Sequence, residues 1–204
     1  MFVYMGDVGD RILAGAVEAA SVHGIGRMSV GDVAARAGLS RATVYKHFGS
    51  KDELVAAAVR REARALIDAV VAHVADIADL RGAVTEAVLV TLQLARAHPL
   101  LDRVVRTEPE RLVPLLTTDD GLVVPVLRGP VEAVVHERLP ELDEVVVRRV
   151  ADVLLRLLIS YSLSAPDDPP ELVAAVVGAL VVDGAAAVTV PGGFAGTSVP
   201  EEAS

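Results

Sequence analysis

The strongest constraint on the fold is a run of helix-start and helix-stop residues near the N-terminus. Serine starts helices well because its hydroxyl accepts a hydrogen bond from a free amide of the first turn. Glycine stops them because it adopts left-handed backbone at little cost. The run consists of Ser29, Gly38, Ser40 and Gly49, and it predicts one helix starting near Ser29 and a second over Arg41–Phe48. Two helices joined by a tight turn that contains glycine make a helix-turn-helix.

Further helices are predicted on both sides of this pair. Apolar residues at helical spacing predict an opening helix over 10–23, and Ser50 with Glu53 forms a capping box for a long helix reaching His73. Later helices are predicted over 80–97, 101–105, 109–116, 121–138, 143–162 and 170–188. The segments "HPLL", "LPELDE" and "SAPDDPP" are expected to be connections, because proline cannot continue a helix interior. No strand pattern persists, so the predicted fold class is all-α.

The helix-turn-helix stretch also concentrates residue types that are scarce elsewhere. The chain has two lysines and six aromatic residues, and Tyr45, Lys46, Phe48 and Lys51 all fall within seven positions. The net charge is −9, but residues 1–64 carry 9 basic and 7 acidic side chains, while the remaining 140 carry 10 and 21. This division hints at an anion-facing head on an acidic body.

Projected at 100° per residue, the helix over 41–48 has two unlike sides. Val44 and Phe48 fall on one side, which is expected to pack on the two preceding helices. The other side is small and polar first and then basic, and it holds Ala42, Thr43, Lys46 and His47. Small residues let a helix approach base edges, and basic residues reach guanine or phosphate, so this side suits a DNA major groove.

Residues 12–54 resemble the DNA-binding head of the TetR family of bacterial transcriptional regulators. The text "VAARAGLSRATVYKHFGSKDEL" follows the family pattern "IA..AG.S..T.Y.HF..K..L" at nearly every position. The resemblance covers about a fifth of the chain, and the rest matches only in being helical and of suitable length. It implies a homodimer whose two recognition helices enter the major groove of a palindromic operator on double-stranded DNA.

The resemblance also implies roles for individual residues. Three are implied to lie near bases: Arg41, Ala42 and Thr43. Five are implied phosphate contacts: Ser29, Thr43, Tyr45, His47 and Lys51. Lys46 could take either role, and backbone amides near Ser29 and Ser40 can also meet phosphates. Simpler interpretations stay open, with Phe48 and Tyr45 as packing residues and His47 as a solvated histidine.

The implied domain order is a helix-turn-helix DNA-binding domain over 1–50, a helical effector-binding and dimerisation domain over 51–190, and a disordered tail over 191–204. The last two helical segments, "VVVRRVADVLLRLLISYSL" and "LVAAVVGALVVDGAAAVTV", are apolar around nearly their whole circumference. Such helices need a core or a partner. In the TetR family the last two helices usually form a four-helix bundle across the dimer axis, and the alternative here is a monomeric core.

A ligand pocket is expected among the helices between residues 80 and 161, where a few polar groups stand in aliphatic surroundings. The polar groups are Gln93, Arg96, His98, Arg103, Arg106, His136, Arg156 and Tyr161. Core helices with snorkelling arginines show the same pattern, so no single residue is assigned. The aliphatic composition suggests a small lipophilic effector.

No catalytic, metal or cofactor site is predicted. Cysteine is absent, the five histidines have no HExxH spacing, and GxSxG and phosphate-cradling glycine loops are lacking. The N-terminus does not read as a secretory signal. The apolar stretch over 172–182 is shorter than the roughly 20 residues of a bilayer span, so it predicts a buried helix. A cytoplasmic protein without membrane contact is therefore expected.

Three functional hypotheses follow. The first is a ligand-responsive DNA-binding regulator, repression being the commonest mode of the family. The second is a DNA-binding regulator without a small-molecule effector, and the third is a helical protein-interaction module whose helix-turn-helix is structural. A cavity in the body separates the first two, and DNA binding separates both from the third.

Overall fold

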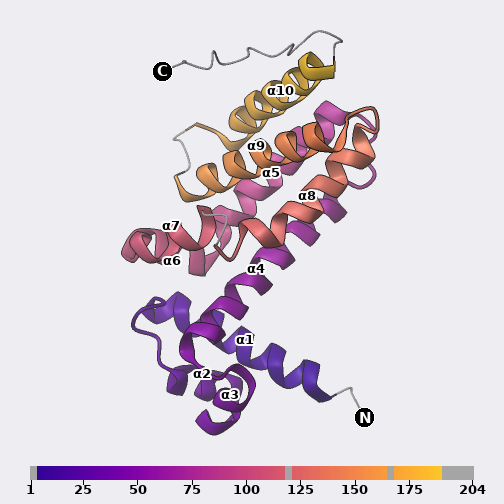
Figure 1. Ribbon diagram of the computed structural model, residues 1–204. Helices are drawn as coiled ribbons and strands as arrows, with labels where there is room; N and C mark the ends of the chain where they lie inside the picture. The colour runs from indigo at the N-terminus through magenta and orange to yellow at the C-terminus, as the bar shows by residue number, and fades with distance from the viewer. Residues whose placement is uncertain (1–3, 118–120, 165–167, 190–204) are drawn as a thin grey trace, which may run out of the picture.

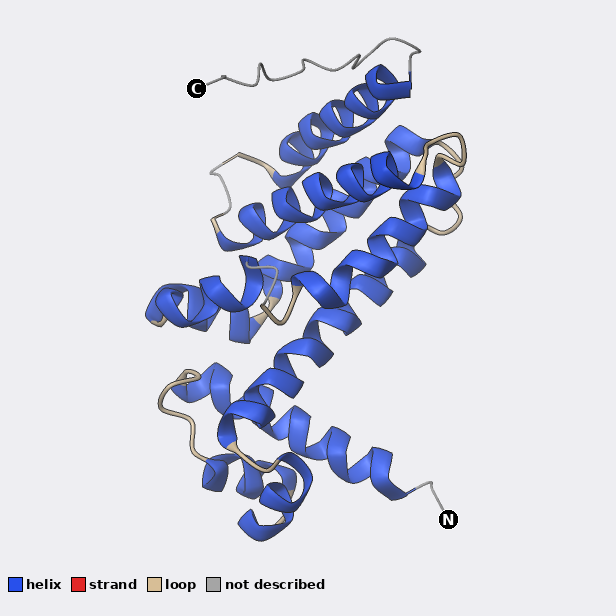
Figure 2. Ribbon diagram, in the orientation of Figure 1, coloured by secondary structure: helices blue, strands red, loops and turns tan. Residues whose placement is uncertain are grey.

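The computed structural model describes residues 4–117, 121–164 and 168–189, and every regular element in these ranges is a helix (Figure 2). This confirms the all-α prediction. The helices in the described ranges are α1 (Tyr4–His23), α2 (Val30–Ala37), α3 (Arg41–Phe48), α4 (Lys51–Val74), α5 (Leu80–Ala97), α6 (Pro99–Thr107), α7 (Pro109–Thr117), α8 (Val124–Arg138), α9 (Glu144–Leu163) and α10 (Pro170–Thr189). The tail predicted over 191–204 lies outside the described residues.

Helices α1–α3 form a small head, α5–α10 form a larger body, and α4 runs from one into the other (Figure 1). There are two apolar cores, and α4 contributes to both. Its Leu54 and Ala58 are buried in the head core, whereas Val59, Ala63 and Ile67 are buried in the body core. Any rearrangement of the body that moves α4 therefore acts directly on the packing of the head.

The caps of the short helices form largely as the sequence predicts. Ser29 and Asp32 make a complete capping box, and Gly38 adopts left-handed backbone with φ of 65°. Ser50 accepts a hydrogen bond from the Glu53 amide at 3.1 Å, but only this half of the predicted box is present. The Ser50 amide instead donates to the carbonyl of Phe48 in the preceding turn.

Three predicted helix boundaries are wrong. Helix α1 begins at Tyr4 rather than near residue 10, because its early turns include Val8, which packs against the head core. Helix α6 begins within "HPLL", because proline is tolerated at the first helical position and His98 caps this end. Helix α8 begins at Val124 rather than at residue 121, because the amides just before it bond to the carbonyl of Leu115.

Helix α10, whose apolar sequence predicts a buried helix that needs a core or a partner, is buried on one face. Val173, Ala174 and Val177 are buried, and Asp183 forms an ion pair with Arg81 of α5. The opposite face is open to solvent, because within the described chain α10 packs mainly against α5. Residues 170–187 are long and apolar enough to cross a bilayer by length and composition, yet one face of this helix belongs to the body core.

Candidate functional site

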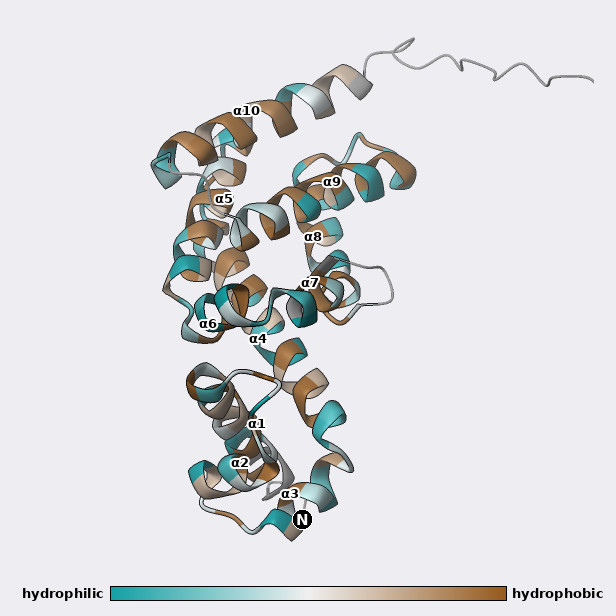
Figure 3. Cartoon of the chain, turned by 90° about the vertical axis from the view of Figure 1, so that its left-hand side faces the viewer, coloured by the Kyte–Doolittle hydropathy of each residue, from teal (hydrophilic) through white to brown (hydrophobic). Residues whose placement is uncertain are grey.

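The predicted recognition helix α3 is held in the head by its apolar side. Val44 is 1% exposed, and Phe48 packs against the head core. This side packs against α2, as the helical projection predicts, and against α4 rather than α1, although all four helices contribute to one core. The head forms the end of the molecule opposite α10, and α3 lies at the tip of that end (Figure 3).

The predicted DNA-contacting residues lie together on α3 and at the adjacent helix starts. Six of them are exposed: Ser29, Ser40, Arg41, Ala42, Tyr45 and Lys46. Three are partly exposed: Thr43, His47 and Lys51. Tyr45 is 50% exposed, so its ring is divided between the helix packing and solvent. The structure thus brings all nine residues to one end of the molecule.

The two serine caps shape the polarity of this surface. Ser40 Oγ accepts from the Thr43 amide at 3.0 Å and lies 2.8 Å from Thr43 Oγ1. Ser29 Oγ donates to the Asp32 carboxylate at 2.6 Å. The hydrogen bonds from Ser29 hold the pKa of Asp32 below its ordinary value, so this carboxylate is charged at neutral pH. The start of α2 therefore carries a negative charge, whereas the start of α3 has no acidic residue in its first turn.

Two of the predicted cations are engaged with the protein's own backbone. Arg41 lies over Gly31 at the start of α2, where a larger residue would collide with its guanidinium group. Lys51 Nζ donates to the carbonyl of Gly26 at 2.8 Å. An ammonium has three donors, so Lys51 keeps two for other acceptors.

Gly26 is also held from the body, through a contact that the sequence does not predict. Glu108, between α6 and α7, accepts a hydrogen bond from the Gly26 amide at 2.7 Å, and its side chain is only 13% exposed. We call Gly26, Lys51 and Glu108 the Gly26 clasp. The clasp fixes the α1–α2 loop to the start of α4 on one side and to the body on the other.

A cavity of about 150 Å³ lies in the body beside α4. Its walls come from α4, α5, α6, α8 and α9, together with Ile25 of the α1–α2 loop and Leu116 of α7. Ile25 is 7% exposed and also belongs to the head core, so one residue touches both the cavity and the head. Four lining side chains are polar: Glu62, Thr91, His98 and Ser162.

Of the eight polar groups considered from sequence, only His98 lines this cavity; the other seven line neither it nor its smaller neighbour. Glu62, Thr91 and Ser162 were not expected from sequence. Thr91 lies in an otherwise apolar stretch of helix, which is a usable signal, whereas Ser162 stands beside Ser160 and Tyr161 and gives no such signal. Glu62 stands among arginines, and its sequence context is typical of a solvated helix surface.

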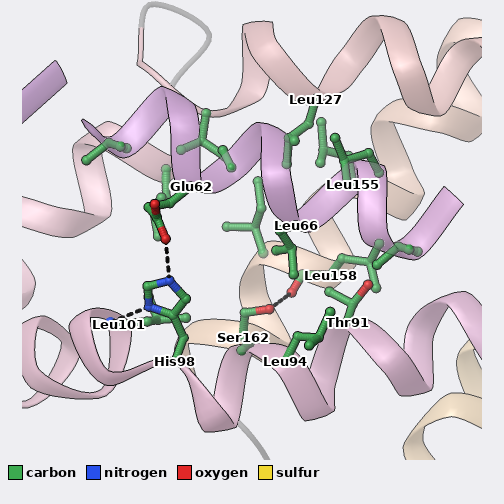
Figure 4. Close-up of a pocket in the computed structure, with 18 of the residues that line it drawn as sticks. Glu62, Leu66, Thr91, Leu94, His98, Leu101, Leu127, Leu155, Leu158 and Ser162 are labelled. Atoms are coloured by element: carbon green, nitrogen blue, oxygen red, sulfur yellow. Dashed lines mark hydrogen bonds and ion pairs between the residues drawn. The ribbon is translucent and has the colours of Figure 1, made fainter. Parts of the chain in front are cut away.

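Glu62 and His98 form the polar end of the cavity (Figure 4). His98 Nε2 lies 3.0 Å from Glu62 Oε2, and His98 Nδ1 accepts from the Leu101 amide at 3.4 Å. The proton of a neutral ring is therefore on Nε2, and it is donated to Glu62. This hydrogen bond holds the pKa of Glu62 below its ordinary value, against the opposing effect of burial.

A second cavity of about 70 Å³ adjoins the first and shares Ile67, Val70, Val131 and Leu158 with it. Its one charged lining residue is Arg138. The Arg138 guanidinium donates to the carbonyls of Val74, at 2.8 Å, and of Ile77. The two cavities together follow α4 from Val59 to Val74, which is roughly 22 Å of helix.

Helices α9 and α10 expose large apolar side chains. On α10, Leu172, Val176 and Leu180 recur every four residues and are 53%, 49% and 65% exposed. On α9, Val145 and Val153 are 59% and 55% exposed. A stripe of this kind marks an interaction surface more often than a solvated one. In the described part of the chain, no group of three or more His, Asp or Glu residues is arranged to hold a metal ion.

Two protein families match most of the described chain. Residues 12–58 match the family described as bacterial regulatory proteins, tetR family. Residues 79–183 match the bacterial tetracyclin repressor C-terminal domain. The first match contains the nine predicted DNA-contacting residues, and the second contains most of the cavity walls.

An uncharacterized HTH-type transcriptional regulator of Mycobacterium tuberculosis is 32% identical over 92 residues, which is 45% of this chain and 46% of that protein. The chain thus matches about half the length of this relative. Among solved structures, the TetR family repressor AlkX from Dietzia sp. strain DQ12-45-1b, implicated in biodegradation of n-alkanes, has a TM-score of 0.71 at 21% identity over 86% of this chain and 96% of its own. The regulator FadR from Bacillus subtilis, solved in complex with stearoyl-CoA, has a TM-score of 0.60 at 17% identity, covering 86% and 98%. These two likenesses show a shared fold.

Proposed function

This chain belongs to the TetR family of DNA-binding transcriptional regulators, and on that premise we propose that it is a ligand-responsive repressor that binds a palindromic operator as a homodimer. Its proposed place of action is the cytoplasm, where bacterial DNA lies. One observation carries the ligand response: Ile25 lines the body cavity and is at the same time part of the head core. A ligand in the cavity would therefore touch the loop that precedes α2 and α3.

The proposed DNA surface is the exposed side of α3. Ala42 is small enough for the helix to approach base edges, and Arg41 and Lys46 supply cations on either side of it. Phosphate contacts are proposed for Thr43, Tyr45, His47 and Lys51, and for the backbone amides at Ser40. Ser29, the fifth predicted contact, donates both its hydroxyl proton and its amide proton to the Asp32 carboxylate, so a phosphate there would have to displace that carboxylate. These contacts would set the register of the head on the duplex, and the base-edge contacts would give specificity.

The proposed dimer interface is the exposed apolar face of α9 and α10. Along α10 the face is a single line of Leu172, Val176 and Leu180. Obligate interfaces are as apolar as protein cores, and this face has that character. Two copies joined through this face would present two heads to one duplex. A palindromic operator requires such a pair, because two-fold symmetry in the protein is matched by two-fold symmetry in the DNA.

The proposed mechanism is a shift between two arrangements of the dimer. Reading two successive half-sites needs recognition helices about 34–36 Å apart, one turn of the duplex. A ligand that fits the cavity better in another arrangement moves α4 and the α1–α2 loop, and the two recognition helices then no longer have that spacing. It shifts the balance only by its difference in affinity for the two arrangements.

The proposed effector is a small lipophilic molecule. The cavity lining is aliphatic apart from four side chains, and burial of apolar surface would drive binding. AlkX is implicated in biodegradation of n-alkanes and FadR was solved in complex with stearoyl-CoA, and the lining found here is compatible with an aliphatic ligand.

The experiment that tests the function is selection of bound duplexes from a random pool. A palindrome is expected, recovered at nanomolar protein and released when an aliphatic effector is added. A palindrome that no small molecule releases would favour the second hypothesis, a regulator without an effector. No enriched sequence would count against DNA reading altogether.

A further inference from the structure

The polar atoms that face the larger cavity are all hydrogen-bond acceptors. Thr91 Oγ1 donates its proton to the carbonyl of Ala87 at 2.7 Å, and Ser162 Oγ donates to the carbonyl of Leu158 at 2.7 Å. Each hydroxyl has a single proton, so only lone pairs remain for a ligand. Both hydroxyls could therefore receive a hydrogen bond but give none while these bonds are kept.

The Glu62–His98 pair also presents only hydrogen-bond acceptors. The ring proton of a neutral His98 goes to Glu62, and its other nitrogen is occupied by the Leu101 amide. The Glu62 carboxylate accepts only, and one hydrogen bond leaves most of its lone pairs open. No lysine or arginine lines this cavity. Its polar end therefore offers a negative charge and acceptors, with no available donor.

The adjoining smaller cavity does not supply a cation that would reverse this polarity. Arg138 is its one charged lining residue, and both terminal nitrogens of its guanidinium donate to carbonyls at the C-terminal end of α4. The acceptor-rich wall and the arginine thus belong to different cavities. A polar group that enters beside Glu62 meets only acceptors.

We propose that the effector is an aliphatic chain that ends in a hydrogen-bond donor, in the simplest case a primary alcohol, and that the cavity rejects the carboxylate of the same length. The proposal rests on the proposed function, since it takes the body cavity as the effector site. The alcohol hydroxyl donates to Glu62 while its chain covers Leu66, Leu127 and Leu155 (Figure 4). A carboxylate has no proton to give and would bring a second negative charge beside Glu62, whose side chain is 28% exposed.

The volume sets the length of the chain. A cavity of about 150 Å³ accommodates a molecule of about six carbons, as benzene in an engineered cavity of that size shows. Extension into the neighbouring 70 Å³ would allow a few more. An eight-carbon chain is therefore the appropriate probe.

The test is isothermal titration calorimetry of the full chain at pH 7 with 1-octanol and with octanoate. We expect 1-octanol to bind at least about tenfold more tightly, because the charged acceptor gains a donor in one case and a repelling charge in the other. In Glu62→Gln, whose amide can both donate and accept, this preference should shrink several-fold. The matched control is Asp68→Asn, which removes one charge from the exposed side of the same helix; the preference should be unchanged.

Equal binding of the two probes, or tighter binding of octanoate, would overturn the inferred preference for a hydrogen-bond donor. The proposal that the effector is aliphatic would stand. An unchanged preference in Glu62→Gln would also overturn the inference. Failure of both probes to bind would overturn the effector part of the proposed function as well, while duplex selection still tests DNA binding. The wild-type comparison decides by itself if the variant does not fold.

Discussion

Replacing Glu108 with alanine should loosen the head from the body while leaving both apolar cores intact. Glu108 accepts the Gly26 amide at 2.7 Å and is 13% exposed, so the substitution leaves a partly buried amide without its partner. A hydrogen bond to a charged group contributes about 1.5–3 kcal/mol. For a chain of this length, each kcal/mol corresponds to a shift of about 2–4 °C in Tm, so we expect a loss of about 3–12 °C.

The control is Glu110→Ala, two residues later and exposed, which should change stability by no more than about 0.5 kcal/mol. Differential scanning calorimetry of both variants at neutral pH measures the difference.

A further variant, Gly24→Ala, separates two effects at this loop. Gly24 has φ of 82°, and a side-chain carbon there would collide with the Glu108 carboxylate. The loss of stability caused by Gly24→Ala should therefore fall to that of backbone strain, about 1 kcal/mol, when Glu108 is also replaced by alanine.

The clasp also makes a functional prediction, because it links the α6–α7 junction to the loop before the recognition helices. Glu108→Ala should reduce the factor by which effector changes operator affinity, because a rearrangement of the body then moves the head less. Fluorescence anisotropy of a labelled operator, with and without effector, measures that factor. A Glu108→Ala protein with the stability of the control and undiminished coupling would refute the clasp as a connection between the domains.

Four further predictions concern separate sites. Anisotropy titrations of Lys46→Ala distinguish the two roles left open for this residue: a phosphate contact predicts weaker binding across sequences and a slope of log K against log salt lower by about 2, one unit for each copy in a dimer, whereas a base contact predicts relaxed preference at one base pair. Gly15→Ala should cost about 1–3 kcal/mol because a side-chain carbon would lie 3.0 Å from a carbonyl of α2, whereas a side-chain carbon at Gly9 of the same helix meets nothing, so Gly9→Ala should be neutral or slightly stabilising in thermal melts. Leu180→Lys on the exposed face of α10 should lower the mass measured by sedimentation equilibrium to that of a monomer. The pKa of Glu62 is lowered in the folded protein, so the ionised carboxylate stabilises the fold above the ordinary pKa of a glutamate. This stabilisation is lost as the pH falls through the lowered pKa, so the Tm difference between wild type and Glu62→Gln should shrink below about pH 4.

The head could be predicted from sequence because its signals are local. Ser29 with Asp32, the left-handed Gly38 and Ser40 all act within one helical turn of their own positions, and the structure contains each of these caps. The packing side of α3 follows equally from helical geometry, and Val44 is buried accordingly. Local hydrogen bonds and periodicity leave few alternatives for a stretch of this kind.

The cavity could not be predicted in the same way, because helical residues in the body have competing partners. Arg106 and Arg156 are arginines of the segment expected to hold the ligand, yet each pairs with an aspartate one turn earlier, Asp102 and Asp152. Such i,i+4 pairs satisfy a charge without any contribution from the fold. Thr91 and Ser162 are satisfied just as locally, each by the carbonyl four residues earlier, so local hydrogen bonding does not distinguish a polar residue that lines a cavity from one that faces solvent.

The connection between the two domains is the least accessible to sequence reasoning, for a physical reason. Glu108 and Gly26 are 82 residues apart, and neither a glutamate before a proline nor a glycine in a loop indicates its partner. The contact exists because α6 packs against the head, where Leu100 and Val104 are buried in the same core as Ile25. Apolar packing brings the two backbones together, and the hydrogen bond then fixes their register. The sequence thus contains the recognition surface in its local pattern, whereas the link that would make that surface respond to the body arises only from the packing of distant helices.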